Sequence, residues 1–381
     1  MSARKPKIRL TAAPARIPPP AADTGDPVAR FEIHYYCYLN HQGQAIRRLP
    51  DIAHDPDRLI ALYRAMLLTR QFDTKAIALQ RTGQLGTYAS SLGQEAIGVA
   101  IGTAMQPEDV LVPAYREYGA QFLRGVSMTD ILLYWGGDER GMDYRVPRED
   151  FPICVPVASQ AAHAAGIAYA FKQRRQARVA VCVLGDGGTS KGDFYEAINL
   201  AGAWQLPVLF VVNNNQWAIS VPREKQSAAA TLAQKAIAGG FSGEQVDGND
   251  VIALYERVTH ALGTIRKGNG PVLIEALTYR MCDHTTADDA SHYRPDEEVA
   301  AQQMYDPLRR LRQYLLYAGY WSENKDARLQ DECATEVEAA VKAYLDTPAQ
   351  PPESMFDYLY AELPEALAEQ REQVRRRDTD D

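Results

Sequence analysis

The chain has 381 residues, enough for two domains or for one large domain with extensions, and a formal net charge of −8. This acidic balance, with a pI of about 5.5, provides no basic field for nucleic acid, and no apolar run approaches the ~18 residues of a membrane span. Five scattered cysteines without a CxxC pair argue against a disulfide framework or a zinc site and favour the reducing cytoplasm.

The N-terminal segment, residues 1–54, is predicted to be an arm that precedes the main domain. Residues 1–22 contain basic but no acidic side chains, a composition compatible with an organelle transit peptide. The run Pro18–Pro20 instead favours a partly disordered arm that docks on a partner. Residues 31–50 alternate apolar and polar and include an Asn-His-Gln-Gly turn, so we expect a short hairpin there.

The first part of the main domain combines helices with a short strand. A helix capped by Asp55 is predicted to run to Gly83, and a second helix follows Gly93. A short strand then leads to Tyr115 and Arg116. An arginine fork matches phosphate oxygens, and a tyrosine hydroxyl adds a donor.

A helix beginning at Ser159 carries small residues four positions apart, at Ala162, Gly166 and Ala170. Such a face permits close helix contact and suggests a subunit interface, although tight internal packing is an open alternative. His163, within this alanine-rich helix, is interpreted as a core histidine rather than a catalyst.

The centre of the sequence is a strand, helix and strand. Val179–Leu184 is a continuous apolar run typical of a strand covered on both faces. A glycine-rich turn follows, then a helix from Asp193 with one apolar side, and a second buried strand at Val208–Val212. This strand stops at Asn213–Asn215. Open parallel sheets bind ligands at the carboxyl ends of such strands.

Two common phosphate loops do not match this turn. Lys191 precedes Gly192, in the wrong order for a Walker A loop, and the dinucleotide fingerprint does not place an acid inside its glycine turn. Asp186 would repel a diphosphate unless a cation lay between them. Mg²⁺ fits, because it prefers oxygen ligands shared between a protein carboxylate and phosphates, and Asn215 would add a neutral oxygen.

The rest of the chain is predicted to continue the sheet and end in helices. The expected elements are a helix at 231–240, a turn at 245–250, a helix ending at Arg266, a strand at 272–279, a helix starting at Pro307 and a last helical pair around a linker at 347–352. The polar segment 279–294, which contains His284, should be a mobile loop. The main domain is assigned to 55–330 and a C-terminal helical extension to 331–381.

Two nearby segments resemble the thiamine diphosphate motif: GDGGTSKGDFYEAINLAGA and, after it, NNNQWAIS. Their sequences specifically resemble the alpha subunits of the decarboxylating component of 2-oxo acid dehydrogenase complexes. The segment RTGQLGTYASSLGQEA resembles the same subunits. The resemblance implies an α/β fold with a mostly parallel sheet covered by helices on both faces. It also implies thiamine diphosphate and Mg²⁺ as cofactors.

Site residues follow from the same resemblance. His284 would lie near the reacting carbon of the cofactor, where a histidine can donate or accept a proton. The residues implied to bind the cofactor are Tyr115, Arg116, Val155, Val157, Asp186, Gly187, Gly188, Asn215, Trp217 and His284. The residues implied at the metal are Asp186, Asn215 and Trp217. Relatives often have Gly and Ser beside this histidine, where this chain has Asp283 and Thr285, which leaves regulation by phosphorylation open.

The resemblance further implies a beta subunit, most simply in an α2β2 assembly, and transfer of an acyl group to the lipoyl domain of a dihydrolipoyl acyltransferase. Pyruvate is the predicted 2-oxo acid substrate, because Asp138–Gly141 replaces the basic stretch of branched-chain relatives. Branched-chain 2-oxo acids or acetoin are an alternative. A non-catalytic α/β scaffold subunit is an alternative of another class.

Overall fold

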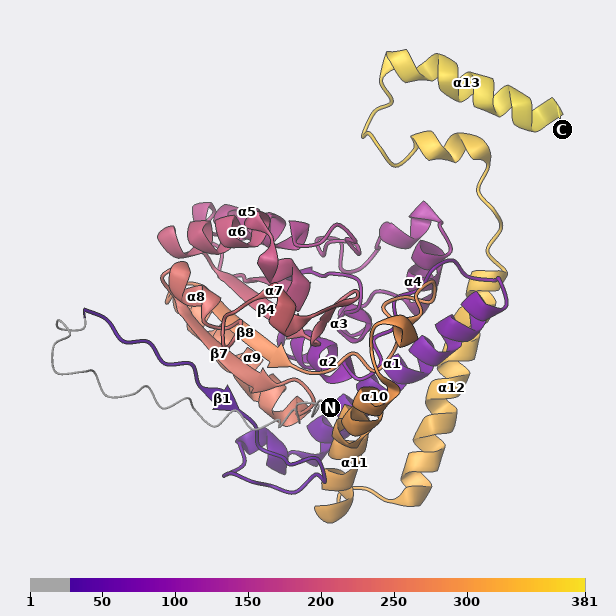
Figure 1. Cartoon of the computed structure of the whole chain (residues 1–381). Coiled ribbons are helices and arrows are strands. Elements are labelled where there is room, and N and C mark those ends of the chain that lie inside the picture. The colour runs from indigo at the N-terminus through magenta and orange to yellow at the C-terminus, as the bar shows by residue number, and fades with distance from the viewer. Residues whose placement is uncertain (1–27, 381) are drawn as a thin grey trace, which may run out of the picture. The chain divides into compact units, whose positions relative to one another are not determined.

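The structure, a computed structural model, describes residues 28–380 (Figure 1). Contacts group the described residues from Ile33 onward into one compact unit. The predicted arm over residues 1–22, with its choice between a transit peptide and a docking segment, lies outside the described residues.

Apolar runs form a six-stranded sheet in the order β1-β7-β8-β4-β3-β2, and each of its pairings is parallel. Its strands are β1 (Tyr35–Tyr36), β2 (Val110–Val112), β3 (Ala180–Gly185), β4 (Val208–Asn214), β7 (Ser242–Asp247) and β8 (Val272–Leu277). A small antiparallel pair consists of β5 (Trp217–Ala218) and β6 (Val221–Pro222). The mostly parallel sheet expected from the sequence is confirmed.

Helices cover both faces of this sheet. The α-helices are α1 (Pro56–Arg81), α2 (Glu95–Ala104), α3 (Tyr118–Leu123), α4 (Met128–Trp135), α5 (Ser159–Gln173), α6 (Gly192–Ala203), α7 (Arg223–Gln226), α8 (Lys235–Ala238), α9 (Val251–Arg266), α10 (Asp296–Gln302), α11 (Pro307–Tyr317), α12 (Glu323–Leu345) and α13 (Glu365–Asp380). The 3-10 helices are η1 (Asp51–His54), η2 (Glu139–Met142), η3 (Asp186–Ser190), η4 (Ala290–His292), η5 (Gln303–Tyr305) and η6 (Pro352–Phe356). No helix of the described residues has both the length and the apolar character of a bilayer span.

Alternate residues of the central strands enter two different cores. Val181 and Val183 of β3 pack with residues of α1, α2 and α9. Cys182 and Leu184 of the same strand point to the other face and pack with α5 and α6. Because side chains alternate along a strand, both faces of β3 are buried, which explains its continuous apolar sequence.

The predicted helix starts are mostly confirmed. Asp55 caps α1, and its side chain accepts a hydrogen bond from the backbone N–H of Arg58. Helix α2 follows Gly93, and α11 begins at Pro307 as expected. The helix predicted at 231–240 is shorter, since only α8 (Lys235–Ala238) is α-helical.

Two predictions about the sheet were wrong. The segment predicted as a turn at 245–250 begins inside β7, whose Gln245 donates its backbone N–H to the carbonyl of His34. The polar side chain of Glu244 in this strand is held by an ion pair with Arg257 at 2.7 Å. The hairpin expected at 31–50 is reduced to one antiparallel bridge, between Leu39 and Ala45, because β1 joins the main sheet instead.

Helix α5 keeps its four-residue pattern of small residues on the outside. Ala162 and Gly166 are exposed, and a Cβ added at Gly166 would meet nothing within 4 Å. Tight internal packing of this face is therefore wrong, while the subunit-interface interpretation stays a prediction. His163 is also exposed, with its ring centroid 5.5 Å from that of Phe151, so the interpretation of a core histidine was wrong.

The predicted boundary between the main domain and the C-terminal extension, at 330/331, falls inside α12. Val337 and Val341, beyond this boundary, are buried in the same core as α1. Lys75 of α1 also forms an ion pair with Glu338 at 2.6 Å. The three-part division of the chain stays a prediction, although α12 packs as part of the main core.

Candidate functional site

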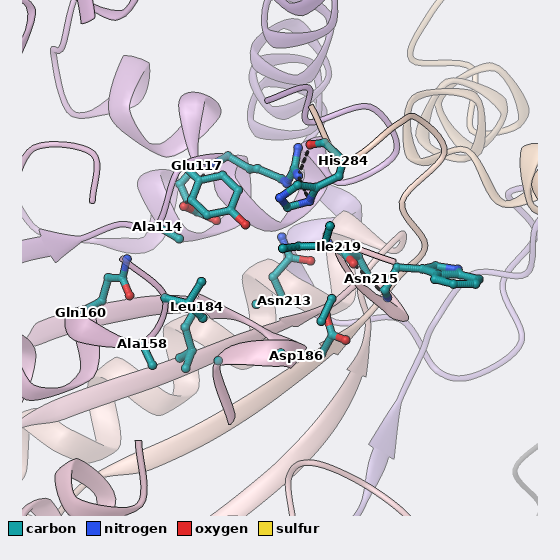
Figure 2. A pocket seen from close by; sticks show the side chains of 18 residues that line it. Ala114, Glu117, Ala158, Gln160, Leu184, Asp186, Asn213, Asn215, Ile219 and His284 are labelled. Atoms are coloured by element: carbon teal, nitrogen blue, oxygen red, sulfur yellow. Dashed lines mark hydrogen bonds between the residues drawn. The ribbon is translucent and has the colours of Figure 1, made fainter. Parts of the chain in front are cut away.

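A cavity of about 160 Å³ lies where β3 and β4 end (Figure 2). Gly185 at the end of β3 pairs with Asn213 of β4, which brings the glycine turn and the asparagine run to one sheet edge. The cavity is lined by Ala114, Tyr115, Arg116, Glu117, Val157, Ala158, Gln160, Leu184, Gly185, Asp186, Gly187, Gly188, Asn213, Asn215, Trp217, Ala218, Ile219 and His284. Every predicted cofactor residue except Val155 is among them.

Asp186 is a buried carboxylate with little to balance its charge. It is 2% exposed and accepts a hydrogen bond from the side-chain amide of Gln226 at 3.1 Å. No ion pair of the described residues includes it. Burial raises the pKa of Asp186 to about 6, although the bond from Gln226 and the charge of Arg280 lower it. A buried carboxylate in this state suits a cation better than a direct phosphate contact.

The amide of Asn215 has a defined orientation. Its Nδ2 donates to Oε1 of Gln94 at 3.0 Å, and its Oδ1 accepts from the backbone N–H of Trp217 at 3.3 Å. The site thus has a carboxylate from Asp186 and an amide oxygen from Asn215, both oxygen donors that Mg²⁺ prefers. The backbone carbonyl of Trp217, the third residue predicted at the metal, accepts a hydrogen bond from Nη1 of Arg280 at 3.4 Å. The described residues contain no cluster of three or more His, Cys, Asp or Glu side chains suited to a metal, so any ion here would need additional ligands.

Three residues that line the cavity each have a buried side-chain polar atom without a hydrogen-bond partner. The atoms are Oε1 of Gln160, Oδ1 of Asn213 and Nε1 of Trp217. Buried polar atoms are normally satisfied, so unpartnered ones at a cavity are suited to a bound molecule or to water. Together with Asp186, they fit a polar ligand that arrives with a cation.

His284 lies on the side of the cavity opposite Asp186 (Figure 2), and Arg116 contacts it there. The Nη2 group of Arg116 donates to the carbonyl of His284 at 2.6 Å and lies 3.1 Å from Nδ1 of its ring. The guanidinium also lies 5.1 Å from the ring centroid of Tyr115. The three residues predicted from two distant segments are therefore in direct contact or close to it.

We expect His284 to remain neutral throughout the physiological range. Burial, Arg116 and Arg280 lower its pKa from 6.5 to about 4, and only Asp288 raises it. Above pH 6.5 the imidazole of His284 is neutral in both the folded and the unfolded chain. As the pH falls from 6.5 towards 4, the unfolded chain takes up a proton at this imidazole before the folded chain does. His284 therefore lowers the stability of the folded state in that range. A ¹³C-histidine NMR titration, assigned with His284→Ala, should show no His284 transition between pH 5.5 and 8. A midpoint near 6.5 would contradict the burial.

The glycine turn has no room for a side chain at one position. A Cβ added at Gly187 would lie 2.5 Å from Cβ of Ala218, closer than real Cβ contacts allow. We expect Gly187→Ala to lower the unfolding free energy by about 1–3 kcal/mol, the usual range for overpacking. The double variant Gly187→Ala/Ala218→Gly should recover most of this loss in thermal denaturation. Wild-type stability of the single variant would show that the turn can adjust.

Some predictions and the site do not coincide. Val155 lies outside the cavity lining and is 49% exposed, whereas Val157 lines it. Sequence reasoning missed Glu117, Gln160 and Asn213. Glu117 follows Arg116 directly, and burial raises its pKa to about 7. Asn213 belongs to the same run of asparagines as the predicted ligand Asn215. Of the three missed residues, only Gln160 therefore neither adjoins a predicted site residue nor belongs to a run that contains one.

The sequence is similar to those of known proteins over most of its length. The sequence profile of the dehydrogenase E1 component family matches residues 63–353. The pyruvate dehydrogenase E1 component subunit alpha of Staphylococcus epidermidis is 40% identical over 337 residues, which cover 88% of this chain and 90% of that protein. The subunit of the same name from Acholeplasma laidlawii is 41% identical over 319 residues, covering 83% and 92%. That of Staphylococcus aureus is 39% identical over 337 residues, covering 88% and 90%.

Proposed function

Because the chain belongs to the dehydrogenase E1 component family, we propose that it is the alpha subunit of a pyruvate dehydrogenase. In this role it takes part in the oxidative decarboxylation of pyruvate and in transfer of the acetyl group to a lipoyl group of an acyltransferase. The names and extents of the similar alpha subunits support this proposal. The main structural support is that Arg116, Asp186 and His284, from distant parts of the chain, line one cavity.

The cavity suits Mg²⁺ and thiamine diphosphate. When bound, this cofactor supplies the electron sink that decarboxylation of a 2-oxo acid requires. Asp186, Asn215 and the carbonyl of Trp217 would hold the ion, and Tyr115 and Arg116 would hold the diphosphate. Neutral His284 would then be free to accept or donate a proton beside the reacting atoms.

A beta subunit would complete the site. Val157 and Ile219, which line the cavity, are 43% and 54% exposed, and apolar side chains at a cavity mouth are typical of surfaces that a partner covers. We therefore propose active sites between alpha and beta subunits in an α2β2 assembly, and a lipoyl domain as the acceptor. A cytoplasmic location stays a prediction.

The test is co-expression of this chain with a beta subunit. Reduction of an artificial electron acceptor, which takes the place of the lipoyl group, should be measured with pyruvate, branched-chain 2-oxo acids and acetoin. We expect the highest kcat/KM for pyruvate. A higher value for a branched-chain acid or for acetoin would replace the substrate assignment. Failure of every substrate in a folded complex that binds the cofactor would favour the scaffold alternative.

A further inference from the structure

Asp73 lies in the middle of α1 and is 1% exposed, yet its carboxylate is fully hydrogen-bonded. It accepts from the Tyr88 hydroxyl at 2.9 Å, the Ser90 hydroxyl at 2.5 Å and the Ser91 backbone N–H at 2.7 Å. All these donors belong to one short segment, residues 88–91. Burial raises the pKa of Asp73, and the hydrogen bonds from this segment oppose that shift. The partners of this carboxylate are therefore the hydrogen-bond donors of residues 88–91 and not a neighbouring cation, so the carboxylate fixes the position of that segment.

The segment 88–91 in turn contacts Arg116, which lines the cavity, and the loop that carries His284. The carbonyl of Ser90 accepts a hydrogen bond from Nη1 of Arg116. The backbone of Tyr88 pairs with Thr286, since its N–H donates to the threonine hydroxyl at 2.9 Å and its carbonyl accepts the threonine N–H at 2.9 Å. Thr286 lies two residues after His284, so this pairing fixes the loop that carries the histidine.

We infer that Asp73 is a positioning residue of the cofactor site, and this inference rests on the proposed function. Through residues 88–91, its carboxylate holds Arg116 and the His284 loop in the arrangement that receives the diphosphate end of the cofactor. Asp73 itself lies outside the cavity lining. If the Asp73 carboxylate loses its charge, the hydrogen-bond donors of the buried segment 88–91 lose a suitable acceptor. The segment should then shift, and Arg116 should lose the Ser90 carbonyl as a partner in a fixed position.

A purely structural role is the competing explanation, and the chain offers a matched control. Asp250 is also a fully buried carboxylate, 0% exposed, and it lies outside the cavity lining. Its oxygens accept hydrogen bonds from the backbone N–H groups of Tyr38, Leu39, Ile252 and Ala253. Asp250→Asn should therefore reduce stability as Asp73→Asn does, but without changing the cofactor site.

The experiment compares wild type, Asp73→Asn and Asp250→Asn in the complex with the beta subunit. Binding of thiamine diphosphate in excess Mg²⁺ is measured by calorimetry, and thermal denaturation is measured without cofactor. We expect Asp73→Asn to raise the Kd of the cofactor about tenfold or more, the range for losing charged hydrogen bonds, with little change for Asp250→Asn. The KM for pyruvate at saturating cofactor should stay close to that of wild type.

Each result decides the inference. A folded Asp73→Asn complex with the affinity of wild type overturns it, as does equal weakening in both variants. If Asp73→Asn fails to fold, Tyr88→Phe decides, because it removes one donor and keeps the stacked ring beside Tyr118. An unchanged Kd in Tyr88→Phe would then overturn the inference. Failure of the wild-type complex to bind the cofactor would instead reject the proposed function.

Discussion

Replacing Asp186 by alanine is expected to abolish Mg²⁺-dependent binding of thiamine diphosphate while the chain stays folded. The ion would lose the carboxylate that the site provides, and we expect the Kd of the cofactor to rise roughly 100-fold or more. The stability of the folded state should not fall, because burying a carboxylate without a cationic partner is itself unfavourable. Calorimetry with the cofactor at fixed Mg²⁺, together with thermal denaturation with and without cofactor, measures both effects.

Asp193→Ala is the matched control for this change. Asp193 lies seven positions further along the chain, but its side chain is 47% exposed and pairs with Lys191 at 3.0 Å. Its removal should leave the affinity for the cofactor unchanged. Wild-type affinity in Asp186→Ala would remove the metal role assigned to this carboxylate.

Replacing Arg116 by lysine is expected to weaken cofactor binding about 10- to 100-fold, although the charge is kept. Arg116 contacts the carbonyls of Ser90 and His284 with separate nitrogens of one fork, and a lysine ammonium cannot reproduce both contacts and also hold a diphosphate. Release of the His284 carbonyl should also make the loop at 279–294 more sensitive to proteolysis. Calorimetry and limited proteolysis measure the two effects separately.

The control for this substitution is Arg58→Lys in α1. The guanidinium of Arg58 donates a solvent-exposed hydrogen bond to the Tyr255 hydroxyl at 2.8 Å. Neither cofactor affinity nor cleavage of the loop should change in that variant. If Arg116→Lys bound the cofactor as well as wild type, recognition of the diphosphate would have to come from other residues.

The sequence was most informative where one local pattern determines the structure. Val179–Leu184 and Val208–Val212 are apolar because helices cover both faces, and parallel strands necessarily bring their carboxyl ends together. The sequence pattern alone therefore predicts that Asp186 and Asn215 lie at one sheet edge. Strand β7 was missed because its sequence is polar, and its position depends on pairing with β1 and β8.

Contacts between distant segments were beyond such patterns. Nothing local indicates that Gln226 would bond to Asp186, or that Gln94 would orient Asn215. The resemblance pointed to Val155 as well as Val157, but the backbone turns between them and only Val157 reaches the cavity. Single residues in loops were therefore predicted less well than residues at strand ends.

Strand β1 consists only of Tyr35–Tyr36, yet it covers an edge of the main sheet that would otherwise be open. It is the outermost member of the sheet on that side and occupies the hydrogen-bonding edge of β7. A shortened chain beginning at residue 50 would present that edge, with free amides and carbonyls, to other molecules. Bare edges of this kind are templates for aggregation, so truncations made for expression should keep residues 33–40.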